Sequence, residues 1–222
     1  DEGMKALQYL RPDDEVAVMA FGKWATVRQD FTKDRSLIIK RIGEIEGMGY
    51  WIREGTYIKE AVYQAAAHFN KALNPDSRRA IIIITDNKEY EPQALGHSKS
   101  EAIEQLFASG SVLSGLIVGD FQSEAAEYKK NGFTLSDSIN DYAEQTGGIV
   151  MQIEKQDAVE KLGRLIERLR TRYSFGYSSL NAKRDGKFRK IRLKISSAVE
   201  KREGEIAIIT KKGYYGRAQS TR

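Results

Sequence analysis

The clearest pattern along the chain is a series of short apolar runs that alternate with stretches in which apolar residues recur at helical spacing. Residues 15–21 (EVAVMAF) follow the turn signal RPDD, and residues 25–31 (ATVRQDF) alternate in character, so both are predicted to be strands. Helical periodicity then covers residues 34–47, where Asp34 can cap the helix, and residues 57–73. The first third of the chain therefore predicts two strands followed by two helices.

The second half repeats one strand after each helix. The run AIIIIT at residues 80–85 is continuously apolar, which is typical of a strand buried on both faces, and further strands are predicted at residues 111–119 and 148–153. The intervening and following helices are predicted at about residues 100–109, 136–145 and 157–172. This alternation predicts an α/β, Rossmann-like fold with a mainly parallel sheet and helices on both faces.

The pattern changes after residue 172. Three segments, at residues 173–180, 187–195 and 204–210, have strand character and are separated by turns rather than helices. We therefore expect a main domain at residues 1–172 and a small C-terminal antiparallel β appendage at residues 173–222 that packs on it.

Composition narrows the class of protein. Of the 222 residues, 41% are hydrophobic and 30% are charged, which is the balance of a globular domain, and no apolar run is long enough to span a bilayer. The absence of cysteine excludes disulfides and thiolate chemistry. The net charge of +5 is concentrated after Arg164. That excess fits either a solvated surface or an anionic partner such as nucleic acid, lipid or acidic polysaccharide.

A candidate site follows from the position of Asp86. Ligands of open α/β sheets bind beyond the carboxyl ends of the strands, and Asp86 ends the apolar run. Thr56 opens the helix predicted at residues 57–73, where it can cap the helix or face the same sheet edge. A hydroxyl and a carboxylate are hard oxygen ligands, so Thr56 and Asp86 together predict a site for Mg²⁺, with Mn²⁺ or Ca²⁺ as substitutes.

Residues around these two would shape the rim of the site. We expect contacts to a partner from a set that flanks Thr56 and Asp86 in the sequence: Tyr50, Trp51, Gly55, Asn87 and Glu89. Exposed aromatic side chains are effective binding anchors, although core packing explains a tryptophan equally well. Glu91 and His97 could add metal ligands, or they could be ordinary polar loop residues. No nucleophile motif, phosphate-binding loop or histidine-glutamate metal motif is present, which favours a binding module over an enzyme.

The order of these motifs resembles a von Willebrand factor type A domain. The segments that carry the resemblance are RPDDEVAVMAF, EGTYIKEAVYQAA, RRAIIIITDN, VLSGLIVG and EQTGGIV. The tail segments RYSFGY, DGKFRKI and KKGYY are similar to those of bacterial proteins called VWFA-related. The resemblance covers nearly the whole chain, through the order and spacing of its motifs.

In that family a metal-ion-dependent adhesion site joins three loops, and Thr56 and Asp86 match the threonine and the aspartate of the second and third. The first motif, Asp-x-Ser-x-Ser, is absent, and Asn87 stands where a glycine is common. The family's first strand lies in the middle of the sheet, so its absence would leave two strand edges unpaired. We therefore expect that an N-terminal portion is missing from this sequence or that another chain supplies it.

The resemblance implies a protein-binding or adhesion module, located outside the cytoplasm of a bacterium as a secreted or periplasmic protein. Its metal site would accept an acidic side chain of a partner protein. Two alternatives stay open. One is a metal-independent structural or scaffolding domain whose site has decayed. The other is binding of an anionic polymer through the basic C-terminal segment, in which Lys187, Arg189, Lys190 and Arg192 would take part.

Overall fold

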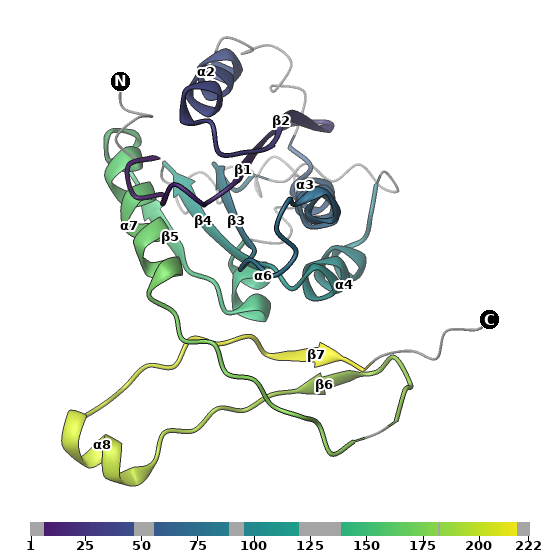
Figure 1. Cartoon of the computed structure of the whole chain (residues 1–222), viewed down its shortest axis with the longest axis vertical. Helices are drawn as coiled ribbons and strands as arrows, with labels where there is room; N and C mark the ends of the chain where they lie inside the picture. Colours follow the sequence, from purple (N-terminus) through teal and green to yellow (C-terminus); the bar gives the residue numbers. More distant parts are fainter. Residues whose placement is uncertain (1–6, 47–55, 89–95, 120–138, 182, 217–222) are drawn as a thin grey trace, which may run out of the picture.

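The computed structural model describes residues 7–46, 56–88, 96–119, 139–181 and 183–216. Its elements form a helix-covered parallel sheet, a separate hairpin beside it, and an extension below one end of the sheet (Figure 1). None of the helices within these ranges has the length and apolar character needed to cross a membrane.

The centre of the fold is a three-stranded parallel sheet in the order β3-β4-β5. Its strands are β3 (Ala80–Thr85), β4 (Val112–Val118) and β5 (Val150–Ile153). In the register of the sheet Ile83 pairs with Gly115, and Gly115 pairs with Val150. The mainly parallel sheet predicted from the alternation of strands and helices is therefore confirmed.

Helices cover both faces of this sheet. One face packs against α3 (Ile58–His68), α4 (Lys99–Ser109) and α6 (Ile139–Thr146), and the other against α7 (Ala158–Arg170). The first interface is the larger core cluster, which includes Ile58, Val62, Ile83, Leu106, Leu113, Ile117 and Tyr142. Leu116, Ile153 and Leu165 are the buried residues of the second. Alternate residues of the strands thus enter two different cores, as the period of a β-strand requires.

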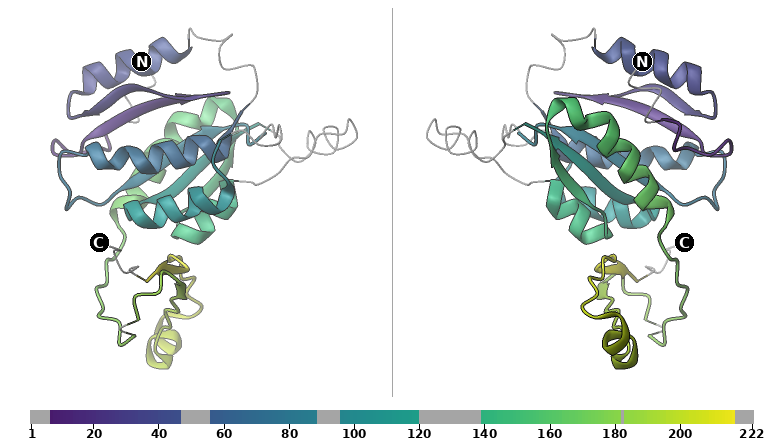
Figure 2. Two further views of the ribbon diagram at one scale, coloured as in Figure 1. Left: turned by 90° about the vertical axis from the view of Figure 1, so that its right-hand side faces the viewer. Right: turned by 90° about the vertical axis from the view of Figure 1, so that its left-hand side faces the viewer.

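The N-terminal hairpin consists of β1 (Val16–Phe21) and β2 (Ala25–Thr32), which pair antiparallel. The helix α2 (Arg35–Glu46) follows and packs on the outer side of the hairpin (Figure 2). The Asp34 carboxylate accepts a hydrogen bond from the Leu37 backbone N–H at 3.1 Å. The capping role predicted for Asp34 is therefore confirmed.

The hairpin and the parallel sheet are not joined by a ladder of hydrogen bonds within the described residues, where they form separate sheets. Phe21 of β1 nevertheless packs against the same core cluster as Ile83 of β3. The prediction that β3 is buried on both faces is wrong at Ile84, which is 46% exposed. The physical reason is that α7 packs on β4 and β5, so this part of the β3 face has no cover from it.

The C-terminal extension (residues 173–216) contains the expected antiparallel pair, but in a shorter form. The pair consists of β6 (Phe188–Lys190) and β7 (Gly213–Tyr215). The segments 173–180 and 204–210 were predicted to be strands and are not, and α8 (Ser197–Glu203) occupies part of a predicted turn. A strand needs a neighbour for its backbone groups, and these segments have none among the described residues.

Candidate functional site

The carboxyl end of β3 is fixed by Asn87. Its backbone lies in the left-handed region with φ 60°, and its side chain is only 1% exposed. The Asn87 N–H donates to Thr85 Oγ1 at 3.0 Å, and its Oδ1 accepts from the Ile139 N–H at 2.9 Å. Asparagine tolerates this backbone conformation better than most residues, which explains the residue type here. A buried side chain cannot offer the direct rim contact expected of Asn87, so its observed role is to support the loop.

Asp86 lies between these two buried residues and points to solvent. Its side chain is 49% exposed, while Thr85 and Asn87 are buried. The Lys88 backbone N–H donates to Asp86 Oδ1 at 3.2 Å, and Lys88 Nζ lies 3.9 Å from Oδ2. The strand thus presents a partly exposed carboxylate from a backbone that is held on both sides. The predicted position of Asp86 at the sheet edge agrees with this geometry.

Thr56 is partly buried and directly precedes the α3 region. The N-terminal capping residue of α3 is Tyr57, whose side chain makes no capping hydrogen bond, so Thr56 does not occupy the capping position. The Tyr57 N–H donates to the Gly22 carbonyl at 3.0 Å, which ties the start of α3 to the end of β1. This bond places Thr56 beside the end of β1, which belongs to the hairpin rather than to the parallel sheet that presents Asp86. A shared site for Thr56 and Asp86 therefore stays a prediction.

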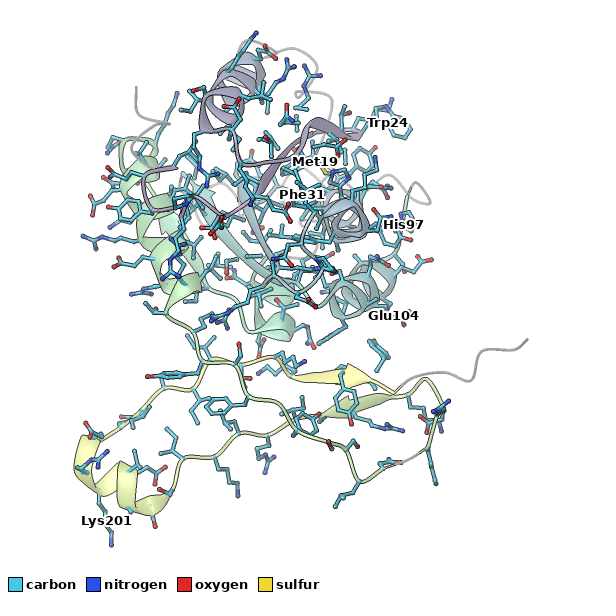
Figure 3. The ribbon with its side chains drawn as sticks, in the orientation of Figure 1. Met19, Trp24, Phe31, His97, Glu104 and Lys201 are labelled. Atoms are coloured by element: carbon cyan, nitrogen blue, oxygen red, sulfur yellow. The ribbon has the colours of Figure 1, made fainter. Side chains whose placement is uncertain are left out.

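A second polar cluster joins α3 to the residues before α4. Glu60 accepts hydrogen bonds from Gln64 Nε2 at 2.7 Å, from His97 Nδ1 at 2.8 Å and from the His97 N–H at 3.0 Å. The His97 ring also stacks on Tyr63, and Figure 3 shows His97 beside α3. Burial acts to raise the pKa of Glu60, but the hydrogen bonds from Gln64 and His97 outweigh it and lower that pKa.

This cluster assigns His97 a different partner from the metal considered in the sequence analysis. Its Nδ1 faces Glu60, and no contact to Asp86 is among its interactions in the described part of the chain. Glu60 was not identified from the sequence. Glu60 lies four residues after Thr56 and four before Gln64, and this helical spacing could have identified it as a neighbour of both.

Several predicted site residues cannot be placed. Tyr50, Trp51, Gly55 and Glu89, as well as Glu91, lie outside the described residues. Two further aromatic residues were candidates for this rim: Trp24 is exposed in the turn between β1 and β2 (Figure 3), whereas Tyr57 is buried. The proposed aromatic rim therefore stays a prediction.

The described residues offer oxygen ligands of the right kind for a divalent cation, but too few of them. Thr56 and Asp86 supply oxygen atoms of the kind that Mg²⁺ prefers. Across the described ranges, however, no group of three or more His, Cys, Asp or Glu side chains is arranged to hold a metal ion. A cation at this edge would need further oxygens from residues outside those ranges, from water or from a partner.

Comparison with known proteins supports the fold. Residues 2–89 match the family model described as von Willebrand factor type A domain. A comparison with curated proteins gave no significant match. Conserved hypothetical protein BatB from Bacteroides thetaiotaomicron superimposes with a TM-score of 0.53 and 19% identity, over 77% of this chain and 86% of that one.

Two other solved structures show similar values. A von Willebrand factor type A protein from Catenulispora acidiphila has a TM-score of 0.50 and 18% identity, over 76% of this chain and 36% of that one. An aerotolerance-related membrane protein from Bacteroides fragilis has a TM-score of 0.47 and 18% identity, over 75% and 85% of the two chains. At these identities, BatB and the Catenulispora acidiphila protein support the fold alone.

Proposed function

We propose that this chain is a protein-binding module of the von Willebrand factor type A kind rather than an enzyme, and that it binds its partner at the carboxyl edge of the parallel sheet. The match of residues 2–89 to that family model and the similar fold of BatB support the proposal. The observation that carries the proposal is the half-exposed Asp86 carboxylate between the buried residues Thr85 and Asn87. A rigid strand end with an exposed charge is a suitable contact point, because little order has to be gained on binding.

The cofactor of this site, in our proposal, is Mg²⁺ held by Thr56 and Asp86 together with oxygens from outside the described residues. When bound, such an ion offers a coordination position to an acidic side chain of the partner. The residues of the chain itself position the site and supply its charge. Asn87 holds the β3 end in place, and Asp86 supplies negative charge at the edge. Tyr50, Trp51, Gly55 and Glu89 are proposed as rim contacts.

An extracytoplasmic location in a bacterium belongs to the same proposal and rests on the family resemblance alone. The alternative of a metal-independent scaffolding domain predicts the same fold with an inert edge. The two differ in whether metal ions act through Asp86, and this difference is open to measurement.

The test is thermal unfolding with Mg²⁺, Mn²⁺, Ca²⁺ or a chelator, for the unchanged chain and for Asp86→Ala. The matched control is Asp76→Ala, which removes an exposed carboxylate near the opposite end of β3. A ligand at about 1,000 times its Kd stabilises the folded state by about 4 kcal/mol. We expect such a gain in the unchanged chain and in the control, and none in Asp86→Ala. Equal unfolding temperatures under all conditions would favour the scaffolding alternative.

A further inference from the structure

The C-terminal extension exposes an unusual number of large apolar side chains. They are Tyr173, Phe175, Tyr177, Leu180, Leu193, Ile206, Ile208 and Ile209. Phe175, for example, is 75% exposed, although it stacks on Tyr173. Large apolar side chains gathered on one part of a folded chain are typical of a surface that contacts another molecule.

The backbone of the same region also lacks partners. Beyond the bond between the Ile191 N–H and the Lys212 carbonyl, residues 192–195 and 205–209 make no backbone hydrogen bond to another part of the described chain. These segments connect β6 and β7 to α8, the helix that contains Lys201 (Figure 3). Unpaired extended segments with apolar side chains are templates for pairing with a further polypeptide.

The base of the extension, in contrast, is anchored to the main domain. Phe107 of α4 contacts the rings of Phe188 and Tyr215 at centroid distances of 5.4 and 5.8 Å. The Lys212 N–H donates to the Gln145 carbonyl at 2.9 Å, and Lys212 Nζ lies 2.7 Å from Glu144 Oε1. The extension is therefore attached to the main domain at β6 and β7, from which the exposed segments continue.

Charge divides the chain at the same place. Residues 173–222 contain 13 basic and 4 acidic residues, which gives +9, whereas residues 1–172 contain 23 basic and 27 acidic residues, which gives −4. Opposite charges favour association between the extension and a main domain, and disfavour association between two extensions. The main domain of another copy is thus an electrostatically complementary surface that the sequence itself provides.

We propose that the C-terminal extension mediates self-association, by docking its exposed apolar segments onto the acidic main domain of a second copy of this chain. Two such contacts related by a two-fold axis would close a dimer, in which each copy contributes one extension and one main domain. The extended backbone favours a polypeptide over nucleic acid, because nucleic acid does not supply strand pairing. The acidic residues Glu200, Glu203 and Glu205 around α8 disfavour an anionic membrane.

The first experiment is sedimentation velocity of the whole chain, over protein concentrations from micromolar to several hundred micromolar, at low and high NaCl. We expect a concentration-dependent dimer whose dissociation constant rises at least tenfold at high salt. A monomer at every concentration and salt would overturn the proposal. So would a monomer that binds single-stranded DNA or vesicles containing phosphatidylglycerol, since the surface would then serve an anionic partner.

Two pairs of variants locate the contact. Phe175→Ser with Ile208→Ser should abolish the dimer, whereas Leu73→Ser, which removes an exposed leucine of the main domain, should leave it intact. Arg192→Glu with Lys194→Glu should also abolish it, whereas Lys71→Glu with Lys155→Glu changes the net charge equally and should preserve it. All substituted side chains of these four variants are exposed, so the fold should persist. Dimerisation that survives both extension variants would contradict the proposal.

Crosslinking tests the arrangement directly. A mixture of ¹⁴N- and ¹⁵N-labelled copies is treated with a carbodiimide, which joins lysine amines to carboxylates, and mixed-isotope peptides are identified by mass spectrometry. We expect mixed pairs between lysines of the extension, such as Lys190 or Lys194, and carboxylates of residues 1–172. Mixed pairs confined to two extensions, or to two main domains, would overturn the proposed docking.

Discussion

Asn87, at the end of β3, accepts a hydrogen bond on its side-chain oxygen from the backbone N–H of Ile139, the first residue of α6, at 2.9 Å. The two residues are 52 positions apart in the chain, and the side chain of each is fully buried. The bond satisfies one of the N–H groups that a helix leaves free at its start. It also ties the strand that presents Asp86 to the helix that follows the next strand of the sheet. The candidate site is thus supported by a contact between two elements rather than by the loop alone.

Removing this contact should destabilise the fold. Asn87→Ala leaves the Ile139 N–H without its buried acceptor. It also places alanine, which lacks the polar side chain that makes this conformation tolerable, at φ 60°. We therefore expect the free energy of unfolding to fall by about 3 kcal/mol. Asn87→Gly removes the same bond but tolerates the backbone conformation, so the loss should be smaller, about 1–2 kcal/mol. Urea unfolding measures both. Asn70→Ala, at an exposed asparagine, is the control and should change stability little. Equal effects of all three variants would contradict this account.

The cluster around Glu60 should make stability depend on pH. The pKa of Glu60 is lowered in the folded state relative to its ordinary value of 4.5, so the stabilisation is present above that value. It is lost as the pH falls from about 4.5 through the folded-state pKa, because protonation removes the charge that Gln64 and His97 stabilise. The loss should be no more than about 1 kcal/mol, since the cluster is only partly buried.

Glu60→Gln isolates this contribution. The difference in free energy of unfolding between the unchanged chain and Glu60→Gln should shrink as the pH falls below about 4.5, where the Glu60 carboxylate takes up a proton. Glu104→Gln, at an exposed glutamate of α4, provides the matched control. The measurement is urea unfolding at several pH values between 3 and 7. A difference that grows as the pH falls below about 4.5 would show that the sign of the Glu60 shift is wrong.

Gly147 should be intolerant of a side chain. Its φ is +75°, and a Cβ at this position would lie 2.5 Å from the Thr210 carbonyl carbon and 2.6 Å from the Lys211 nitrogen. Gly147→Ala therefore combines backbone strain with a clash against the backbone of the extension, and should cost more than about 2 kcal/mol. Limited proteolysis should then cleave the extension faster, because its anchor is displaced. Gly110→Ala is the control, since it shares a positive φ but has open space around the Cβ position. Similar proteolysis of the two variants would argue against the tight contact.

Much of the fold could be predicted because it is encoded locally. The apolar run at β3, the helical spacing of α3 and the Asp34 cap each depend on residues that are close in sequence, and all three elements occur where predicted. The position of Asp86 follows from the same logic, since it depends only on where a strand ends. Ser98 shows what was missed: its reciprocal capping box with Glu101 has a readable S-x-x-E spacing.

The remaining features depend on tertiary contacts that no local pattern contains. The partners of Asn87 and Glu60 lie 52 and 37 residues away. No local pattern therefore predicted that Asn87 is buried or that His97 faces a glutamate. The segments 173–180 and 204–210 have strand-forming composition but no neighbouring strand among the described residues. The β-propensity of a segment predicts an extended conformation, whereas a paired strand also requires a second strand beside it.

A last prediction concerns the edge of β3 that has no neighbouring strand within the described residues. In a parallel ladder alternate residues of a strand direct their backbone groups to opposite neighbours, and β3 has a neighbour only on the β4 side within the described residues. Amide hydrogen exchange followed by NMR should therefore divide β3 into protected and fast-exchanging residues in alternation, whereas β4, which pairs on both sides where β5 runs beside it, should be protected at Gly115–Val118 without alternation. A further strand paired with this edge would abolish the alternation in β3. Uniform protection of β3 in this chain would mean that its edge is already covered.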